Sequence, residues 1–204
     1  VQATLNQAAP EAMSLAIQFK PKDRPQSTVK ATVKKGRKEI EFEVPMKSMR
    51  LWSLDDPYLY EVEAVLSGGE AKDVVSTYFG MRKISVTKLP GTDFPYIALN
   101  NKPVYLKLAL DQAYHPEGFY TFESDAFMRD EILRSRQIGL NGQRIHVKIG
   151  IPRKLYWADK LGMLIMADVP NSWGQPNADM RNEIEVALRG MIKRDFNHPC
   201  IFSW

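Results

Sequence analysis

Short runs of alternating apolar and polar residues dominate the chain from Met13 to about Val86. Ser14–Phe19 and Glu39–Val44 both repeat every two residues, which predicts half-buried β-strands. Residues 34–37 and 67–70 lie between such runs, and their glycines favour the positive φ of hairpin turns. Nothing in this stretch has a helical period. The pattern predicts an all-β, immunoglobulin-like antiparallel sandwich over residues 1–88.

After residue 88 the pattern changes to alternating strands and helices. Ser124 and Pro152 suit helix starts, and Gly139 and Gly162 suit helix ends. The predicted strands are Val104–Leu110, Gly142–Ile149, Met163–Ala167 and a run from Ile201; the predicted helices are Ser124–Gly139, Pro152–Gly162 and one from about Asn177 towards Pro199. Repeated strand–helix units predict parallel strands with right-handed crossovers.

The length of the chain limits how much of this architecture it contains. A closed β/α barrel needs about 250 residues, whereas 116 residues follow residue 88. We therefore expect residues 89–204 to be the N-terminal half of a β/α (TIM-type) barrel. The last apolar run ends at Trp204 without a turn or polar tail, so we expect a chain truncated from something longer. The exposed edge strands of a half-barrel predict self-association.

Composition indicates a globular, soluble protein. Hydrophobic residues make up 44% and charged residues 25%, and the net charge of +4 comes from interspersed acids and bases. No basic stripe follows the chain, so we expect no nucleic-acid partner. No apolar run approaches the ~18 residues of a membrane span, and no signal peptide is recognisable, so we expect no membrane partner. A single cysteine, Cys200, excludes an internal disulfide and a cysteine-rich metal site. The compartment stays open.

Polar side chains gather where the predicted parallel strands end. Asp111 ends the first strand; Arg144, His146 and Lys148 are predicted on one face of the second; Asp168 ends the third. Ligands meet parallel β/α sheets at the carboxyl ends of the strands. An inward Arg144 and His146 would be costly to bury unless they were paired with Asp111, Asp168 or a polar ligand.

Structural roles compete with binding roles at several of these positions. Asp111 and Asp168 are equally suited to capping the next helix or bonding loop amides, and a lone His146 would fit a hydrogen-bonded core histidine. Tyr114 and Trp173 suit packing or stacking on sugar rings.

The remaining histidines and the cysteine are expected to play no part in a site. We expect a solvated His115, a structural His198 that satisfies backbone carbonyls at a helix end, and a buried Cys200 that acts as a small apolar filler.

Motif searches narrow the function. The sequence holds no Gly-x-Gly-x-x-Gly, no phosphate-binding loop ending in Gly-Lys-Ser/Thr, no His-Glu-x-x-His and no Gly-x-Ser-x-Gly. Nucleotide-binding, zinc-protease and serine-hydrolase functions are disfavoured. No cofactor and no metal-ligating residue is assigned, and metal dependence stays open.

Six segments together resemble glycoside hydrolase family 2, which contains β-galactosidases, β-glucuronidases and β-mannosidases. They occur in the family's order and span most of residues 13–204. The segments are Leu51–Tyr60 (LWSLDDPYLY), Phe79–Ile84 (FGMRKI), Leu99–Lys107 (LNNKPVYLK), Arg144–Lys148 (RIHVK), Leu155–Asp159 (LYWAD) and Arg194–Pro199 (RDFNHP).

The resemblance implies retaining hydrolysis of β-glycosides by a protein with an immunoglobulin-like sandwich and a catalytic β/α barrel. It implies that the sugar pocket is lined by residues at strand ends and in a neighbouring loop, which here are Asp111, Arg144, His146, Asp168, Asn171 and Trp173. The family's acid/base glutamate lies in an Asn-Glu pair just beyond the Trp that matches Trp204, and its nucleophile lies on a later strand. No catalytic residue is therefore assigned, and the chain alone is expected to be inactive. The alternatives are a non-catalytic carbohydrate-binding module and a structural spacer.

Overall fold

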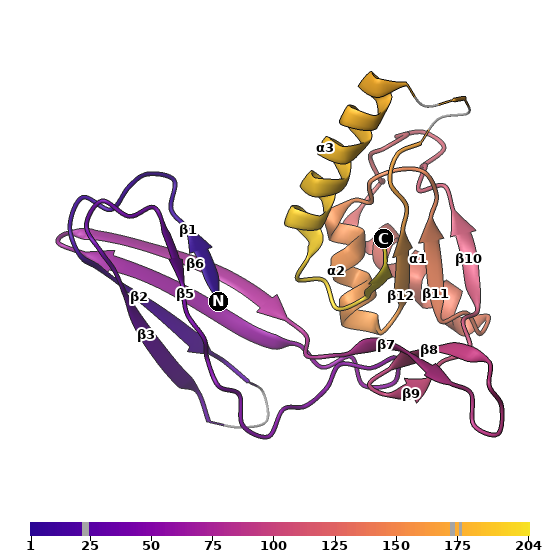
Figure 1. Ribbon diagram of the computed structural model, residues 1–204, viewed down its shortest axis with the longest axis horizontal. Helices are drawn as coiled ribbons and strands as arrows, with labels where there is room; N and C mark the ends of the chain where they lie inside the picture. Colours follow the sequence, from indigo (N-terminus) through magenta and orange to yellow (C-terminus); the bar gives the residue numbers. More distant parts are fainter. Residues whose placement is uncertain (22–24, 172–173, 176) are drawn as a thin grey trace. The chain divides into compact units, whose positions relative to one another are not determined.

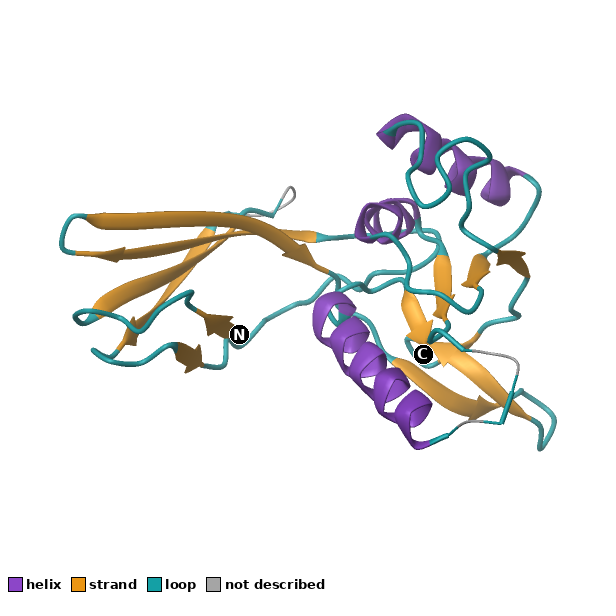
Figure 2. Ribbon diagram, turned by 90° about the horizontal axis from the view of Figure 1, so that it is seen from above, coloured by secondary structure: helices purple, strands orange, loops and turns teal. Residues whose placement is uncertain are grey.

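The computed structural model describes residues 1–21, 25–171, 174–175 and 177–204. The chain forms two compact units, one made of Val1–Met49 and Leu59–Phe79, the other of Arg50–Tyr58 and Gly80–Trp204. In Figure 2 the first unit consists of strands and loops, whereas the helices all belong to the second. The described residues therefore form a mixed, sheet-rich structure with three helices.

The first unit contains two antiparallel sheets. Its strands are β1 (Gln2–Thr4), β2 (Met13–Phe19), β3 (Ser27–Val33), β4 (Glu39–Glu41), β5 (Tyr60–Gly68) and β6 (Ala71–Phe79). The larger sheet has the order β3-β2-β5-β6, and β1 pairs with β4 separately. The strand predicted at Ser14–Phe19 is confirmed as part of β2, while the one predicted at Glu39–Val44 is regular only as far as Glu41.

The core of this unit follows from the period-two pattern of β2. Met13, Leu15, Ile17 and Phe19 are all buried on one face of the larger sheet. Ile40 of β4 packs against the same core. Residues of both sheets thus share one apolar interior.

One of the two predicted hairpins forms and the other does not. Residues 67–70 turn between β5 and β6, with Gly69 at φ 52°. Residues 34–37 form a turn, but β3 pairs with β2 and β4 pairs with β1. The hairpin prediction there is wrong because the Gly36 N–H donates to Ala9 O (2.8 Å), which directs the chain from one sheet to the other.

The second unit joins a small antiparallel sheet to a parallel sheet with helices. The antiparallel strands are β7 (Ile84–Lys88), β8 (Pro95–Leu99) and β9 (Lys102–Pro103); the parallel strands are β10 (Leu108–Asp111), β11 (Gly142–Ile145), β12 (Leu164–Ala167) and β13 (Ile201–Ser203); the helices are α1 (Asp125–Gln137), α2 (Pro152–Leu161) and α3 (Ala178–Asp195). The parallel sheet has the order β10-β11-β12-β13, and Figure 1 shows its labelled strands side by side.

The predicted helix signals are confirmed. Ser124 Oγ accepts the N–H of Phe127 (3.1 Å) at the start of α1, and Asn177 Oδ1 accepts the N–H of Met180 (2.8 Å) at the start of α3. Pro152 opens α2, and Gly162 ends it in the left-handed conformation at φ 71°. These capping residues therefore determine where along the sequence the helices begin and end.

The segment before β5 belongs to the second unit although residues on both sides of it belong to the first. Trp52 is fully buried, and its indole Nε1–H donates to Asp159 O (2.7 Å) at the end of α2. Its backbone N–H donates to Met81 O (2.8 Å), and its carbonyl accepts from Asn100 Nδ2 (3.0 Å). The tryptophan thus ties three distant segments of the second unit together.

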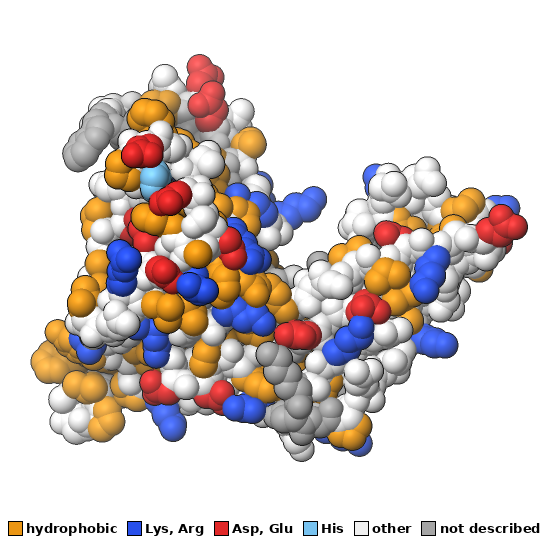
Figure 3. Space-filling view, turned by 180° about the vertical axis from the view of Figure 1, so that it is seen from behind, with side chains coloured by type: hydrophobic (Ala, Val, Ile, Leu, Met, Phe, Trp, Pro, Cys, Tyr) orange, Lys and Arg blue, Asp and Glu red, His pale blue; other side chains and the backbone are white. Residues whose placement is uncertain are grey.

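The helices of the described residues contain no membrane-spanning stretch. None of the three helices is long and apolar enough to cross a bilayer. On the face drawn in Figure 3, Lys and Arg side chains are interspersed with Asp and Glu.

Candidate sugar-binding edge of the parallel sheet

Strand register decides which face of the sheet each predicted site residue occupies. Leu110 is paired with Arg144 and then Met166, while Asp111 is paired with Ile145. Successive side chains of a strand point to opposite faces. Gln143 donates to Ser135 Oγ on α1 (2.9 Å), so its face is the helix-covered one. Arg144 therefore lies on the opposite, open face.

Arg144 and Asp168 form the central pair of this open face. Arg144 Nη2 lies 2.8 Å from Asp168 Oδ2, and Arg144 Nε lies 3.1 Å from both carboxylate oxygens. Such forked pairs are geometrically specific as well as strong. The side chains are 44% and 15% exposed, so Arg144 still faces solvent. The predicted pairing of Arg144 with a strand-end aspartate is present in the structure.

The contact between Arg144 and Asp168 favours the charged form of both side chains. Partial burial by itself would raise the pKa of Asp168, but hydrogen bonds from Arg144 and from the Val147 N–H outweigh it and lower that pKa. The same contact with Asp168 raises the pKa of Arg144. Asp168 therefore stays ionised at neutral pH and accepts hydrogen bonds.

Strained backbone holds the carboxylate in place. The Val147 N–H donates to Asp168 Oδ2 (3.2 Å) from a residue at φ 48°. Positive φ is rare for a β-branched residue and is found where the surroundings enforce it. This kink explains why β11 ends at Ile145 and does not reach Ile149 as predicted.

His146 lies at the same edge, joined to a residue that the sequence did not single out. Its Nδ1 is 3.0 Å from Gln112 Nε2, which follows Asp111 in the chain. Gln112 is exposed and His146 is half-buried. The alternation of strand faces was the signal for Gln112, because the residue after Asp111 must turn towards the face that carries Arg144.

Asp111 belongs to a different cluster, on the helix side of the sheet. Its Oδ2 lies 2.5 Å from Lys154 Nζ, and its Oδ1 accepts the Ala113 N–H (2.7 Å). Lys154, on α2, is only 1% exposed and also contacts Glu131 of α1 (3.0 Å). The structure therefore does not place Asp111 with Arg144 and Asp168. Lys154 was missed because nothing in the sequence marks it as buried.

Lys148 does not share the face of Arg144 and His146, so that prediction is wrong. The chain leaves the strand after Ile145, and Lys148 turns into the loop that follows β10. Its Nζ donates to Ala113 O (2.9 Å) and lies over the rings of Tyr114 and Tyr120. It braces that loop.

Asn171 lies on the loop after β12 and borders a groove of about 400 Å³ along α3. Met180, Ile184 and Ala187 form the apolar wall of this groove. The structure brings Asn171 beside α3. Trp173, the other predicted loop residue, lies outside the described residues.

Asp159, His198 and Cys200 form a buried group whose ligand atoms lie within 4.8 Å of one another. Asp159 Oδ2 is 2.6 Å from His198 Nδ1, and Oδ1 accepts the Cys200 N–H (2.9 Å). Burial raises the pKa of the Cys200 thiol well above its usual range, whereas metals bind the thiolate. We interpret the group as a hydrogen-bond network. The partner of His198 Nδ1 is a carboxylate rather than the predicted backbone carbonyl.

The open face can bind polar ligands, and its carboxylate, Asp168, is not a proton donor of the kind that cleaves glycosides. Gln112, His146 and Arg144 present donors, and Asp168 presents an ionised acceptor. A general acid in glycoside hydrolysis needs a raised pKa, whereas that of Asp168 is lowered. The arrangement suits recognition of hydroxyl groups.

Comparisons with known proteins find similarity to glycoside hydrolases. The sequence model described as "Glycosyl hydrolases family 2" matches residues 1–82. The β-galactosidase of Thermoanaerobacterium thermosulfurigenes is 27% identical over 159 residues, covering 78% of this chain and 21% of the relative. That of Thermoanaerobacter pseudethanolicus is 26% identical, covering 87% of this chain and 23% of the relative.

Solved structures show the same fold. The β-glucuronidase of Parabacteroides merdae superposes with a TM-score of 0.82 over 94% of this chain and 24% of that one, at 20% identity. A β-glucuronidase of Bacteroides uniformis superposes with a TM-score of 0.76 over 98% of this chain and 26% of that one, at 24% identity. The chain spans about a fifth of the length of the curated relatives it matches. Family match, sequence relatives and shared fold confirm the resemblance to glycosyl hydrolases of family 2 that is seen in the motifs.

Proposed function

We propose that the chain supplies the immunoglobulin-like sandwich and the first half of the catalytic β/α barrel of a retaining β-glycosidase. Two sheets around one core in the first unit support the first part. Four parallel strands in sequential order, with helices between them, support the second. The relatives' names make a β-galactoside or β-glucuronide the favoured substrate class.

The observation that carries the proposal is the Arg144–Asp168 pair on the open face at the carboxyl edge of the sheet. Arg144, Asp168, His146 and Gln112 bind the hydroxyl groups of one sugar ring. We propose that Asn171 and Trp173 of the following loop also contact the ring; Trp173 lies outside the described residues. Asp111 acts indirectly: it anchors the β10 end, from which Gln112 projects.

Binding of a single sugar ring tests this assignment. Methyl β-glycosides of galactose, glucuronate and mannose are titrated into the chain by calorimetry. At least one is expected to bind, and Arg144→Ala is expected to weaken it by at least about tenfold, because the substitution removes a charged donor and frees Asp168. Arg189→Ala, on the exposed surface of α3, is the matched control. Equal binding by both variants would refute the site.

We further propose that this chain does not cleave glycosides. Retaining hydrolysis needs two carboxyl groups about 5–5.5 Å apart, one of them a proton donor. Asp168 is ionised against Arg144, and both oxygens of Asp111 are engaged by Ala113 and Lys154. Aryl β-glycosides should show no turnover with the purified chain. Turnover that Arg144→Ala abolishes would overturn this.

A non-catalytic carbohydrate-binding role is the second candidate, favoured by an open polar face whose carboxylate, Asp168, is held ionised by Arg144. The coding sequence after the Trp204 codon separates the two candidates. An Asn-Glu pair within the next few codons supports the glycosidase, and a stop codon there supports the binding module.

A further inference from the structure

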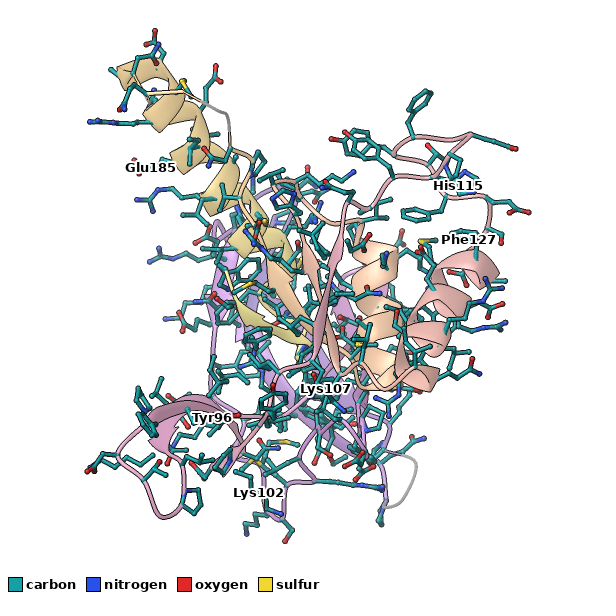
Figure 4. All side chains as sticks on the ribbon, turned by 90° about the vertical axis from the view of Figure 1, so that its right-hand side faces the viewer. Tyr96, Lys102, Lys107, His115, Phe127 and Glu185 are labelled. Carbon is teal, nitrogen blue, oxygen red and sulfur yellow. The ribbon has the colours of Figure 1, made fainter. Side chains whose placement is uncertain are left out.

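The loop between β10 and α1, residues 112–122, is folded around His115. His115 Nδ1 accepts the backbone N–H groups of Glu117 (3.3 Å) and Gly118 (3.2 Å). The backbones of His115 and Phe119 exchange two hydrogen bonds of 2.8 and 2.9 Å. Figure 4 labels His115 next to Phe127 of α1, and their ring centroids are 5.1 Å apart. His115 is therefore an anchor of the loop, not the solvated side chain predicted.

Lys148 is the second anchor of this loop. It is 7% exposed, and its Nζ lies 3.2 Å from the ring centroid of Tyr114 and 4.3 Å from that of Tyr120. The two tyrosine rings are in edge contact at 5.3 Å. A buried cation shared by two rings fixes their positions relative to each other.

Although they are held in place, the two rings remain largely open to solvent. Tyr114 is 56% exposed and Tyr120 is 54% exposed. Ordered aromatic side chains lose little conformational entropy when a ligand covers them.

The polar residues next to the two tyrosines indicate what kind of ligand their rings could bind. Tyr114 is two residues beyond Gln112, and Lys148 is two residues beyond His146, so the tyrosines continue the proposed sugar-binding edge. Ala113 and Val147, which connect the two groups, both have φ of 48°, and strained backbone gathers at functional sites. A pyranose ring offers an apolar C–H face for stacking and hydroxyl groups for the polar neighbours.

We propose that Tyr114 and Tyr120 form an aromatic platform that stacks the second ring of a β-linked disaccharide whose first ring occupies the Arg144–Asp168 edge. This inference rests on the proposed function. It adds to that function the expectation that the chain binds an oligosaccharide more tightly than a simple alkyl glycoside. Recognition by ring faces tolerates different sugars, because each pyranose has such a face.

Paired ligands test the platform. Galactosyl, glucosyl, glucuronosyl and mannosyl β-disaccharides, each beside the methyl β-glycoside of its first ring, are titrated into the chain. At least one disaccharide should bind about tenfold more tightly than its methyl glycoside. Tyr114→Ala and Tyr120→Ala should remove this advantage and leave methyl glycoside binding unchanged. Tyr105→Ala, which removes a tyrosine that is 71% exposed, should change neither.

Two results would overturn the platform. One is that no disaccharide exceeds its methyl glycoside; the other is that the tyrosine variants weaken both ligands of a pair equally. Failure of the proposed function looks different, because then Arg144→Ala changes no affinity while the tyrosine variants still can. Ligand-observed NMR gives the same comparison if the affinities are too weak for calorimetry.

Discussion

At the scale of single residues, the second unit depends on a buried lysine. Lys154 is 1% exposed and lies between Asp111 and Glu131. A buried ammonium group is stable only with such partners, and removing one member of a buried pair leaves the others uncompensated. The lysine joins β10, α1 and α2 directly beneath the proposed sugar-binding edge.

Lys154→Met keeps the length of the side chain and removes its charge. We expect the free energy of unfolding of the second unit to fall by about 3 kcal/mol, because Asp111 loses its cation in a poorly hydrated site. Urea denaturation followed by tryptophan fluorescence measures it, since Trp52, Trp157 and Trp204 lie in that unit and the residues of the first unit include no tryptophan. Lys193→Met, at an exposed position of α3, should change stability by under about 0.5 kcal/mol. Similar losses in both variants would contradict the role of Lys154.

Asp125, at the start of α1, makes stability depend on acid pH. Hydrogen bonds from Arg153 and the indole of Trp157 lower its pKa from 3.8 to about 2. A carboxyl group with a lowered pKa in the folded state stabilises the fold above its unfolded pKa and loses that effect as pH falls through its folded pKa. The stabilisation should be complete above about pH 4 and disappear towards pH 2.

Thermal unfolding of Asp125→Asn and the unsubstituted chain checks this dependence. The variant should melt earlier at pH 7, and the difference should shrink between about pH 4 and pH 2. Asp93→Asn is the control, because Asp93 is 93% exposed and its pair with Lys88 is solvated. A difference that stays constant over this range would refute the assignment.

At the scale of elements, the end of a helix can also be a contact site for a segment that is distant in the sequence. A Cβ added to Gly162 would lie 2.3 Å from Leu54 O, so residues 50–58 pack closely against the left-handed end of α2. Gly139, which follows α1, has a similar positive φ but nothing within 4 Å of such a Cβ. Comparing the two glycines therefore separates the free energy lost to an unfavourable backbone conformation from that lost to a steric clash.

Alanine at each glycine tests that separation. Gly139→Ala should destabilise the second unit by about 1–2 kcal/mol, which is the cost of a left-handed residue with a Cβ. Gly162→Ala should cost about 3 kcal/mol or more, since the Leu54 backbone must also move. Denaturant unfolding measures both. Equal losses would show that residues 50–58 do not pack against this glycine.

Local signals explain which elements the sequence could predict. Ser124, Asn177, Pro152 and Gly162 act within a few residues, so the helix ends followed from the sequence. The end of β11 did not, because the kink at Val147 depends on a contact with Asp168, 21 residues away. Arg144, His146 and Asp168 could be predicted as strand-end residues. The separate location of Asp111 required the register of the sheet and the burial of Lys154.

At the scale of the whole molecule, the parallel sheet has two edges that no other described strand covers. These are β10 and β13, the first and last strands in the order β10-β11-β12-β13. Unpaired backbone groups on such edges can pair with another chain. The chain covers only 21% and 23% of two of its relatives, so its own copies are the available partners in isolation.

Self-association through these edges is the expected behaviour of the purified chain. Light scattering after size-exclusion chromatography should give a mass above 23.3 kDa that rises with concentration. A concentration-independent monomer would contradict open sheet edges.

The most direct test of the account is where on the chain a β-glycoside binds. Backbone ¹H–¹⁵N spectra are recorded during titration with the tightest-binding glycoside of the panel. We predict that the shifted signals cluster at residues 112–114, 144–148 and 168–171, and that the Arg144 Nε–H signal moves with them. Shifts confined to the first unit, or the same shifts in Arg144→Ala, would contradict a sugar-binding edge at the ends of β10, β11 and β12.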